Sequence, residues 1–259
     1  MDFTNLVLQL MNFINLVLQL LQGLGNTLLL FCLTLVLSLP LGMIVTFGRM
    51  SRWTPFRRLG EQGERLRAAE GSPVRVSLAV SLLRRFKPIQ LIVKFLISIL
   101  RGTPLMLQII VAFFGPYYLF HMKLSASYRI IAVVLAFSIN YAAYFAEIFR
   151  SGIESTPVGQ YEAAQVLGYS KKQTFFKIIL PQMIKRVLPP VTNEVITLVK
   201  DTSLAFVITY TEMFTIAKQI AAAQTTIMPL FVAGLFYFIF NAVVAWGMER
   251  IERSLAYYQ

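Results

Sequence analysis

The chain has 259 residues, of which 57% are hydrophobic and only 14% are charged, whereas an average soluble domain has about 25% charged residues. This composition favours a polytopic membrane protein with room for about five or six spans. Its one cysteine, Cys32, and one histidine, His121, exclude an internal disulfide and a zinc site of Cys and His ligands. The phosphate-binding loop sequence does not occur, so any ATP chemistry must come from a partner.

The N-terminal region divides into two predicted helices. The stretch from Phe3 to Gly48 contains no charge, and residues 1–23 repeat a motif, Phe3–Met11 against Phe13–Leu21. Residues 1–23 are predicted to form an interfacial amphipathic helix, because amide side chains recur every three or four residues along it. Residues 24–48 are predicted to be the first transmembrane helix. The amides are Asn5, Gln9, Asn12, Asn15, Gln19 and Gln22.

A basic connection follows at residues 49–101 and holds twelve of the 24 Lys and Arg residues. Residues 88–100 regain apolar character around Lys94, as expected of an amphipathic helix at the membrane face. Residues 102–249 are predicted to form a core with four further spans. We expect these at Thr103–Phe120, Ile130–Phe149, Leu188–Tyr210 and within Gln219–Met248, with loops at 150–187 and 211–226 and a polar tail at 250–259.

The second predicted span has a recognisable start. Pro104 suits the first position of a helix, with Thr103 as its cap. Gly115–Pro116 is expected to kink or end this helix.

The distribution of basic residues predicts the orientation. Five spans place the two chain ends on opposite sides of the membrane. If residues 49–101, 150–187 and 249–259 are cytoplasmic, they hold twenty of the 24 basic residues. The positive-inside rule therefore predicts an N-terminus outside and a C-terminus in the cytoplasm. The same rule explains the net charge of +12 through topology and lipid contact, with no nucleic-acid partner.

Several motifs in order resemble one family. Residues 162–181 read EAAQVLGYSKKQTFFKIILP, and this spacing resembles the EAA loop of bacterial ABC importer permeases. The stretches Arg101–Pro104, Tyr144–Ile153, Pro157–Ala164 and Leu198–Leu204 look like the polar amino-acid branch of that family, whose members serve histidine, glutamine, arginine, lysine or cystine. Residues 50–90 depart from the pattern, since they are longer and more basic than the usual connection. They could be a lipid-contacting surface, an ATPase contact or a tolerated insertion.

The resemblance implies an all-α integral membrane protein of the type I ABC importer fold, with five transmembrane helices and a cytoplasmic coupling helix in the inner membrane of a bacterium. It implies a docking unit for the ATPase in which small alanines allow close approach and Gly168 ends a helix in the left-handed conformation. The alternative is an ordinary cytoplasmic amphipathic helix. The residues of this unit are Gln160, Glu162, Ala163, Ala164 and Gly168.

Charged residues in the fourth predicted span are candidates for the substrate path. Charges inside a span usually face a cavity or a partner. Asp201 lies seven residues after Glu194, so it is about 10 Å deeper along a helix. Two carboxylates would favour a cationic group, whereas Lys200 points elsewhere and could meet a substrate carboxylate or a neighbouring helix. The alternative is a buried charge network that holds the spans together. Thr202 belongs to the same motif and is included in the path.

The third predicted span offers a second polar face. Asn140, Tyr144 and Glu147 share one side of a helix and could present an amide, a hydroxyl and a carboxylate to a zwitterion. Glu147 could instead pair with Arg150, and Asn140 could bond between helices. Thr103 is a cap first and a path residue second.

Taken with the resemblance, these residues predict a permease subunit of an ATP-driven importer for polar amino acids, with a tilt towards basic ones such as arginine, lysine or histidine. The expected partners are a cytoplasmic ATPase dimer that holds ATP and Mg, a second permease copy or homologue, an extracytoplasmic binding protein and membrane lipid. No catalytic residue, metal or cofactor is expected in the chain itself. The alternative is an ATP-independent channel or ion-coupled carrier for a small polar solute.

Overall fold

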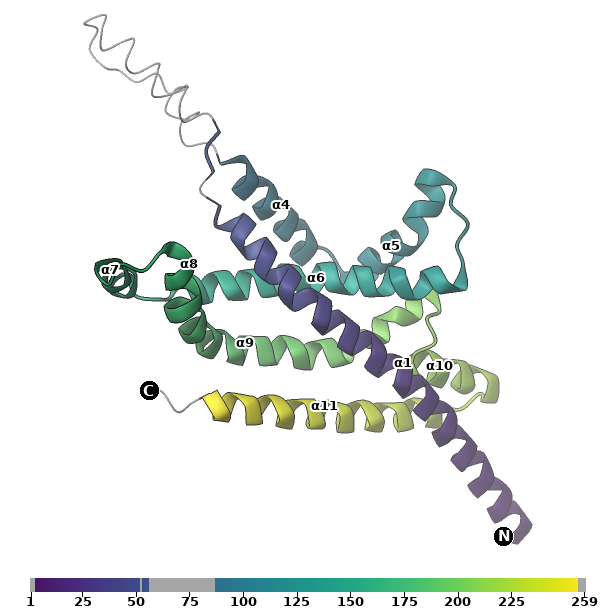
Figure 1. Cartoon of the computed structure of the whole chain (residues 1–259). Helices are drawn as coiled ribbons and strands as arrows, with labels where there is room; N and C mark the ends of the chain where they lie inside the picture. Colours follow the sequence, from purple (N-terminus) through teal and green to yellow (C-terminus); the bar gives the residue numbers. More distant parts are fainter. Residues whose placement is uncertain (1–2, 52, 56–86, 256–259) are drawn as a thin grey trace, which may run out of the picture.

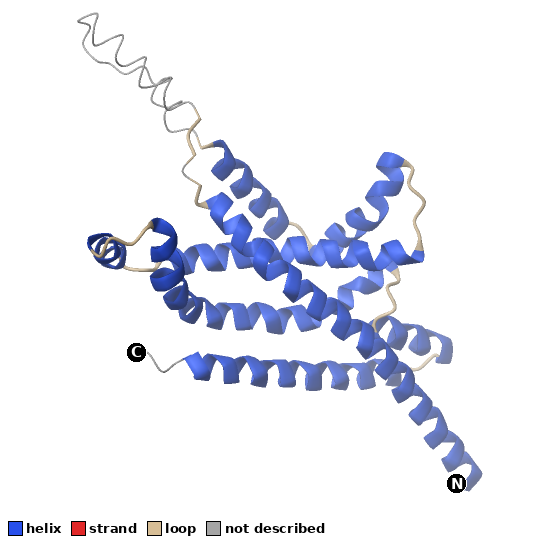
Figure 2. Cartoon of the chain, viewed as in Figure 1, coloured by secondary structure: helices blue, strands red, loops and turns tan. Residues whose placement is uncertain are grey.

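The computed structural model describes residues 3–51, 53–55 and 87–255, and every regular element within these ranges is helical (Figure 2). Most of the predicted insertion at residues 50–90 lies outside the described residues. Helices α6, α9 and α11 run side by side, α1 crosses them obliquely, and α7 and α8 lie beyond one end of the bundle (Figure 1). This end also holds the C-terminus of α11, while the N-terminus lies at the other end.

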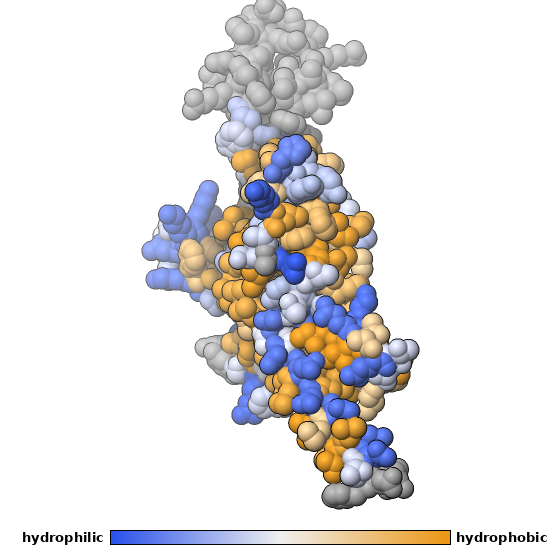
Figure 3. Space-filling view, turned by 90° about the vertical axis from the view of Figure 1, so that its right-hand side faces the viewer, coloured by the Kyte–Doolittle hydropathy of each residue, from blue (hydrophilic) through white to orange (hydrophobic). Residues whose placement is uncertain are grey.

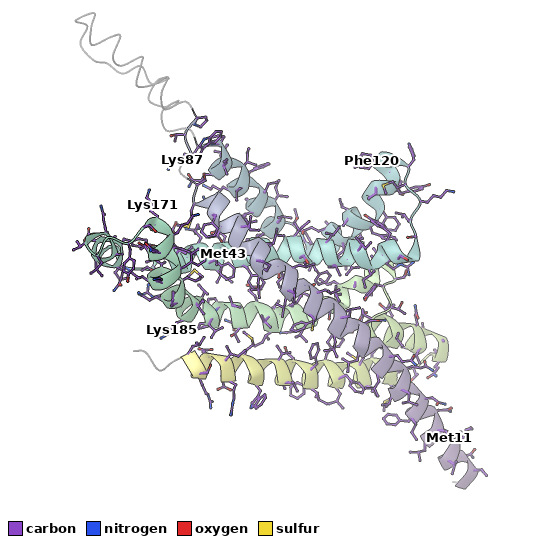
Figure 4. All side chains as sticks on the ribbon, viewed as in Figure 1. Met11, Met43, Lys87, Phe120, Lys171 and Lys185 are labelled. Carbon is purple, nitrogen blue, oxygen red and sulfur yellow. The ribbon has the colours of Figure 1, made fainter. Side chains whose placement is uncertain are left out.

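Helix α1 spans Phe3–Arg49 as one element of 47 residues, about 70 Å long at 1.5 Å per residue. The predicted boundary between residues 23 and 24 is therefore not a break, since the helix continues through Gly23 and Gly25. The N-terminal part around Met11 extends beyond the other helices (Figure 4), and all six amides of the predicted stripe are exposed. An interfacial position for residues 1–23 stays a prediction.

The second predicted span, Thr103–Phe120, is one helix that begins after a sharp bend. Helix α4 (Pro88–Gly102) and helix α5 (Leu105–Phe120) meet at a bend of 107°. The predicted cap was wrong in detail: Pro104 itself is the N-cap of α5, and the Thr103 hydroxyl donates to the carbonyl of Ile99, 2.9 Å away, at the end of α4. Pro104 lacks an N–H and so cannot continue α4, which places the break at this dipeptide. Pro116 lies inside α5 and does not end it.

Helix α6 (Ala126–Glu154) forms the centre of the core. Two thirds (67%) of its most apolar window is buried, against 28% for α1 and 17% for α11. Aromatic rings at four-residue spacing contact one another along it, from Phe137 through Tyr141 and Phe145 to Phe149. Helix α1 crosses at Gly42, where a Cβ would lie 2.8 Å from the Phe145 Cβ. Only glycine permits this close approach, so Gly42 fixes where α1 crosses α6.

The chain after α6 forms short helices and then two long ones. Helix α7 covers Val158–Val166, α8 covers Lys171–Thr174, and the π-helical turn η1 (Phe175–Ile179) leads into α9 (Leu180–Asp201). A 3-10 turn, η2 (Thr202–Ile208), then connects to α10 (Met213–Gln224) and α11 (Met228–Leu255). The predicted loop at 211–226 was wrong, because Glu212 caps a helix there through hydrogen bonds from the N–H groups of Phe214 and Thr215.

Within the described residues, three helices are long and apolar enough to cross a membrane, and the bent pair α4–α5 gives a fourth candidate. Helix α9, the predicted fourth span, does not meet these criteria, although it packs between α6 and α11. Its charged residues explain the difference. Large exposed apolar side chains cover much of the surface in Figure 3, as expected of a protein that contacts lipid.

Candidate functional site: a helical docking unit and a polar cavity

Helix α7 ends in a left-handed turn at Gly168. Its φ of +72° lies in the region that favours glycine. The Gly168 N–H donates to the Gln165 carbonyl and the Tyr169 N–H donates to the Ala164 carbonyl, both at 3.0 Å. These two bonds form a Schellman motif, and they confirm the predicted conformation of Gly168.

The predicted docking residues are arranged around this helix. Ala164 is fully buried in a helix that contacts η1, whereas Gln160, Glu162 and Ala163 are exposed. Several apolar side chains are also exposed although they lie at the end of the bundle. These are Val158, Tyr161, Val166, Leu167 and Phe176. A short helix with an exposed apolar surface, anchored by one buried alanine, is suited to contact another protein.

A π-helical turn joins this unit to α9. It lies between Lys171 and Lys185, which mark its flanks in Figure 4. Ser170 caps α8 in a capping box with Gln173, with N···O distances of 2.9 and 3.3 Å. Helix α7 is therefore connected to α9 through the turn at residues 167–170, helix α8 and η1, and α9 carries the charged residues of the predicted path.

A polar cavity of about 580 Å³ lies where the α4–α5 break meets α6 and α9. Five of the predicted path residues line it together: Thr103, Asn140, Tyr144, Glu194 and Asp201. They come from helices α6 and α9 and from the connection between α4 and α5, at positions nearly 100 residues apart. The sequence-based grouping of these five side chains is thus consistent with one common cavity.

The other predicted path residues lie elsewhere. Glu147 lines two neighbouring cavities, of about 490 and 430 Å³. Lys200 is exposed and lines none of the three cavities described here. Thr202 is fully buried, and its hydroxyl donates to the Val199 carbonyl at 2.7 Å. The structure therefore places Thr202 in the packing of η2 and not on the cavity wall.

Hydrogen bonds orient the cavity walls. The Tyr141 hydroxyl donates to Oδ2 of Asp201 at 2.8 Å. The Asn140 amide donates to the Leu100 carbonyl at 3.1 Å and to Oε1 of Gln108 at 3.0 Å. Asn140 is thus an interhelical contact that also lines the cavity. The sequence left two roles open for Asn140, substrate contact and bonding between helices. The structure shows hydrogen-bond partners for the second role.

Glu147 belongs to a chain of charges between α1 and α6. Its Oε1 accepts from Nε of Arg49 at 3.3 Å, and its Oε2 accepts from Arg150 at 2.7 Å. Arg150 also contacts Glu154. The pairing of Glu147 with Arg150 that the sequence suggested is therefore confirmed, and Arg49 is an additional partner.

The fold is shared with known transport proteins. The sequence profile of the family described as binding-protein-dependent transport system inner membrane component matches residues 71–257. The chain belongs to this family. Members of this family are membrane components of transport systems, so the chain is a transport subunit and not an enzyme.

Individual relatives of this inner membrane component cover most of its length. It is 34% identical to the arginine transport system permease protein ArtQ of Bacillus subtilis (strain 168). The aligned region has 181 residues and covers 70% of this chain and 81% of ArtQ. It is 35% identical to the L-cystine transport system permease protein TcyB of the same organism, with 70% and 76% covered. It is 34% identical to a putative glutamine transport system permease protein GlnP of Rickettsia bellii (strain RML369-C), with 71% and 84% covered.

Solved structures agree in fold. A chain of the crystal structure of an amino acid ABC transporter with histidines superposes with a TM-score of 0.71 at 26% identity and covers 98% of this chain and 99% of that one. A chain of the MetNI methionine ABC transporter in an inward-facing conformation superposes with a TM-score of 0.63 at 16% identity, with 99% and 100% covered. The second likeness shows the fold alone.

Sequence reasoning missed three wall residues of the inner membrane component. Arg101 lines all three cavities, and its guanidinium carbon lies 5.0 Å from the centre of the Tyr144 ring. Tyr141 and Thr197 line the central cavity. Arg101 had been counted with the basic connection, because a guanidinium beside a predicted loop looks like a topology signal. The signal in the sequence was that Arg101 directly precedes Gly-Thr-Pro, which breaks a helix and so places Arg101 at a helix end.

Proposed function

We propose that this chain is the transmembrane permease subunit of an ATP-driven ABC importer for polar amino acids. The observation that carries the proposal is the charge arrangement of the central cavity, in which Arg101 stands on one wall and Glu194 and Asp201 stand on α9. A free amino acid carries a carboxylate and an ammonium group. A wall with both signs of charge matches both ends of such a zwitterion.

The carboxylates support a cationic side chain as well. Asp201 accepts one bond from Tyr141, and Arg101 forms no ion pair with any described residue within 4.0 Å. We assign the substrate carboxylate to Arg101 and the ammonium or guanidinium group to Glu194 and Asp201. This assignment favours arginine, lysine or histidine, and the similarity to an arginine permease supports it. The similarity to cystine and glutamine permeases supports the wider class of polar amino acids as substrates.

The proposed arrangement in the membrane has five spans, formed by α1, the broken pair α4–α5, α6, α9 and α11. Helix α9 spans in spite of its charges because Glu194, Thr197 and Asp201 face the cavity, where water or substrate solvates them. The end of the bundle with α7 and the C-terminus is cytoplasmic, in agreement with the excess of basic residues there. The N-terminus of α1 then lies outside.

The partners follow from the surfaces. The exposed residues of α7, Gln160, Glu162 and Ala163, dock with a cytoplasmic ATPase dimer that holds ATP and Mg, and the rigid path through η1 transmits its closure to α9. Arg101, Thr103, Thr197 and Lys200 are exposed in the single chain, so a second permease copy or homologue encloses the path. An extracytoplasmic binding protein delivers the amino acid.

The test is ATP hydrolysis by the permease reconstituted with its ATPase and binding protein, measured with each of the twenty amino acids. We expect stimulation by arginine, lysine or histidine. Stimulation only by other polar amino acids would retain the importer and overturn the basic preference. An intact complex that no amino acid stimulates would overturn the substrate class.

The alternative function, an ATP-independent channel or ion-coupled carrier, gives a different result. It predicts uptake of a polar solute into proteoliposomes that contain the permease alone, with no ATPase present. The docking helix disfavours this alternative, because a carrier without an ATPase has no use for an exposed apolar helix outside the bundle.

A further inference from the structure

A second, more basic cavity lies beside the proposed path. It has a volume of about 430 Å³ between α1, α4 and α6, and three cations line it: Arg49, Lys94 and Arg101. The one carboxylate on its wall is Glu147, which already accepts hydrogen bonds from Arg49 and Arg150. Lys94 has no hydrogen bond or ion pair with any described residue. The cavity therefore presents two cations, Lys94 and Arg101, that a ligand could neutralise.

The basic side chains follow one stripe of α4. Lys94, Ser98 and Arg101 stand at positions i, i+4 and i+7, which lie on one side of a helix, and all three are exposed and line the cavity. On one flank of the stripe, Val93 and Ile97 pack towards α1 and α6. The other flank is apolar and exposed, and consists of Leu91, Ile92, Phe95, Leu96 and Ile99.

A basic cavity beside an exposed apolar face is chemically complementary to an anionic phospholipid. An ammonium, a guanidinium and a hydroxyl converge where a phosphate could accept from all three. The exposed flank next to them would contact acyl chains, which are as apolar as the side chains they meet. A free phosphate would satisfy the cations and leave the apolar flank without a partner.

We propose that the cavity lined by Arg49, Lys94, Ser98 and Arg101 binds the headgroup of an anionic phospholipid whose acyl chains lie along the exposed face of α4. Because Arg101 also lines the central cavity, the lipid headgroup and the transported solute contact opposite sides of one guanidinium. Lys94 and Ser98 line the lipid cavity and neither of the other two. The proposal goes beyond the transport function and does not depend on which amino acid is carried.

The test compares two charge-removing variants of the same helix. Lys94→Gln removes a cation from the cavity, whereas Lys87→Gln removes a cation at the start of α4 that lines none of the three cavities. The full chain is purified in nanodiscs of phosphatidylcholine with a minor share of phosphatidylglycerol, and the retained phosphatidylglycerol is counted by native mass spectrometry after delipidation. We expect Lys94→Gln to weaken retention about fivefold, and Lys87→Gln and the conservative Lys94→Arg to retain the lipid as wild type does.

Two outcomes would overturn the proposal. Equal loss in Lys94→Gln and Lys87→Gln would show non-specific attraction of an anionic surface to a basic helix. Displacement of phosphatidylglycerol by an equal concentration of inorganic phosphate would show an anion site without lipid recognition. If Lys94→Gln is poorly folded, Ser98→Ala, which removes one headgroup donor without changing the charge, is measured in its place and is expected to weaken retention.

Discussion

The hydroxyl of Tyr141 lies 2.8 Å from Oδ2 of Asp201 and joins the middle of α6 to the last residue of α9. Tyr141 is almost fully buried among the aromatic rings of α6, while Asp201 also faces the central cavity. The bond therefore holds the Asp201 carboxylate on its Oδ2 side and leaves Oδ1 for a ligand. An anchored carboxylate at a cavity wall is preorganised for a cation, because little side-chain freedom is lost on binding.

The Asp201→Asn variant should separate the role of the negative charge from the role of the hydrogen bond to Tyr141. The Asn oxygen can still accept from Tyr141, but the negative charge is lost. We expect roughly ten- to hundredfold weaker stimulation of ATP hydrolysis by a basic amino acid, since a hydrogen bond to a charged group contributes about 1.5–3 kcal/mol. Size-exclusion chromatography should show an intact complex. Dissociation of the Asp201→Asn complex would instead assign this residue to a network that holds the spans together.

Tyr141→Phe is the companion variant. It removes the hydrogen bond and keeps the charge of Asp201. We expect a smaller effect on stimulation than Asp201→Asn and a lower unfolding temperature in detergent, because a half-buried carboxylate loses its donor.

The amide of Asn140 should stabilise the break between α4 and α5. Asn140→Ala removes the bonds to Gln108 and to the Leu100 carbonyl. Loss of these buried bonds should cost about 1–3 kcal/mol and lower the unfolding temperature. Asn193→Ala is a matched control, because Asn193 is exposed and its side chain has no described partner. Equal unfolding temperatures for the two variants would show that the amide contacts do not hold the break.

Much of this arrangement could be predicted from local patterns. The apolar runs predicted the long helices, and Gly168 predicted the left-handed end of α7. The start of α10 was missed, because its cap is Glu212, and glutamate is not among the residues that usually occupy this position. The place of Arg101 on the cavity wall was missed because it depends on the 107° bend after it, and the angle of a bend follows from packing between helices and not from local sequence.

Gly168 should be required for its backbone and not for its small volume. A Cβ built there would meet nothing within 4 Å, while φ is +72°. Left-handed backbone costs most residues about 1–2 kcal/mol, and asparagine tolerates it best. We therefore expect Gly168→Asn to retain most ATP-dependent uptake and Gly168→Arg to abolish it, with normal membrane insertion of both.

Gly159→Ala, in an open part of α7 with helical φ, is the control for substitution in this helix. Undiminished uptake by Gly168→Arg would contradict the coupling role of α7.

The carboxylate of Glu212 should make stability depend on pH. Glu212 lies in the connection between η2 and α10, is fully buried, and accepts from the N–H groups of Phe214 and Thr215 at 2.6 Å and from the Tyr237 hydroxyl at 2.9 Å. Burial raises the pKa of the Glu212 carboxyl above its usual value, although these donors oppose the shift. Between the usual pKa and the raised one, the folded state holds a proton that the unfolded state releases.

The free energy of unfolding should therefore fall as pH rises through that interval and then stay level. Glu212→Gln removes this contribution, because an amide does not titrate in this range. The measurement is the unfolding temperature of the wild type and the variant across the acidic range up to neutral pH, with Glu162→Gln on the exposed face of α7 as control. We expect the difference between wild type and Glu212→Gln to change with pH and the difference for Glu162→Gln to stay constant. Parallel curves for wild type and Glu212→Gln would show that the donors from α10 and α11 fully offset the cost of burying the charge.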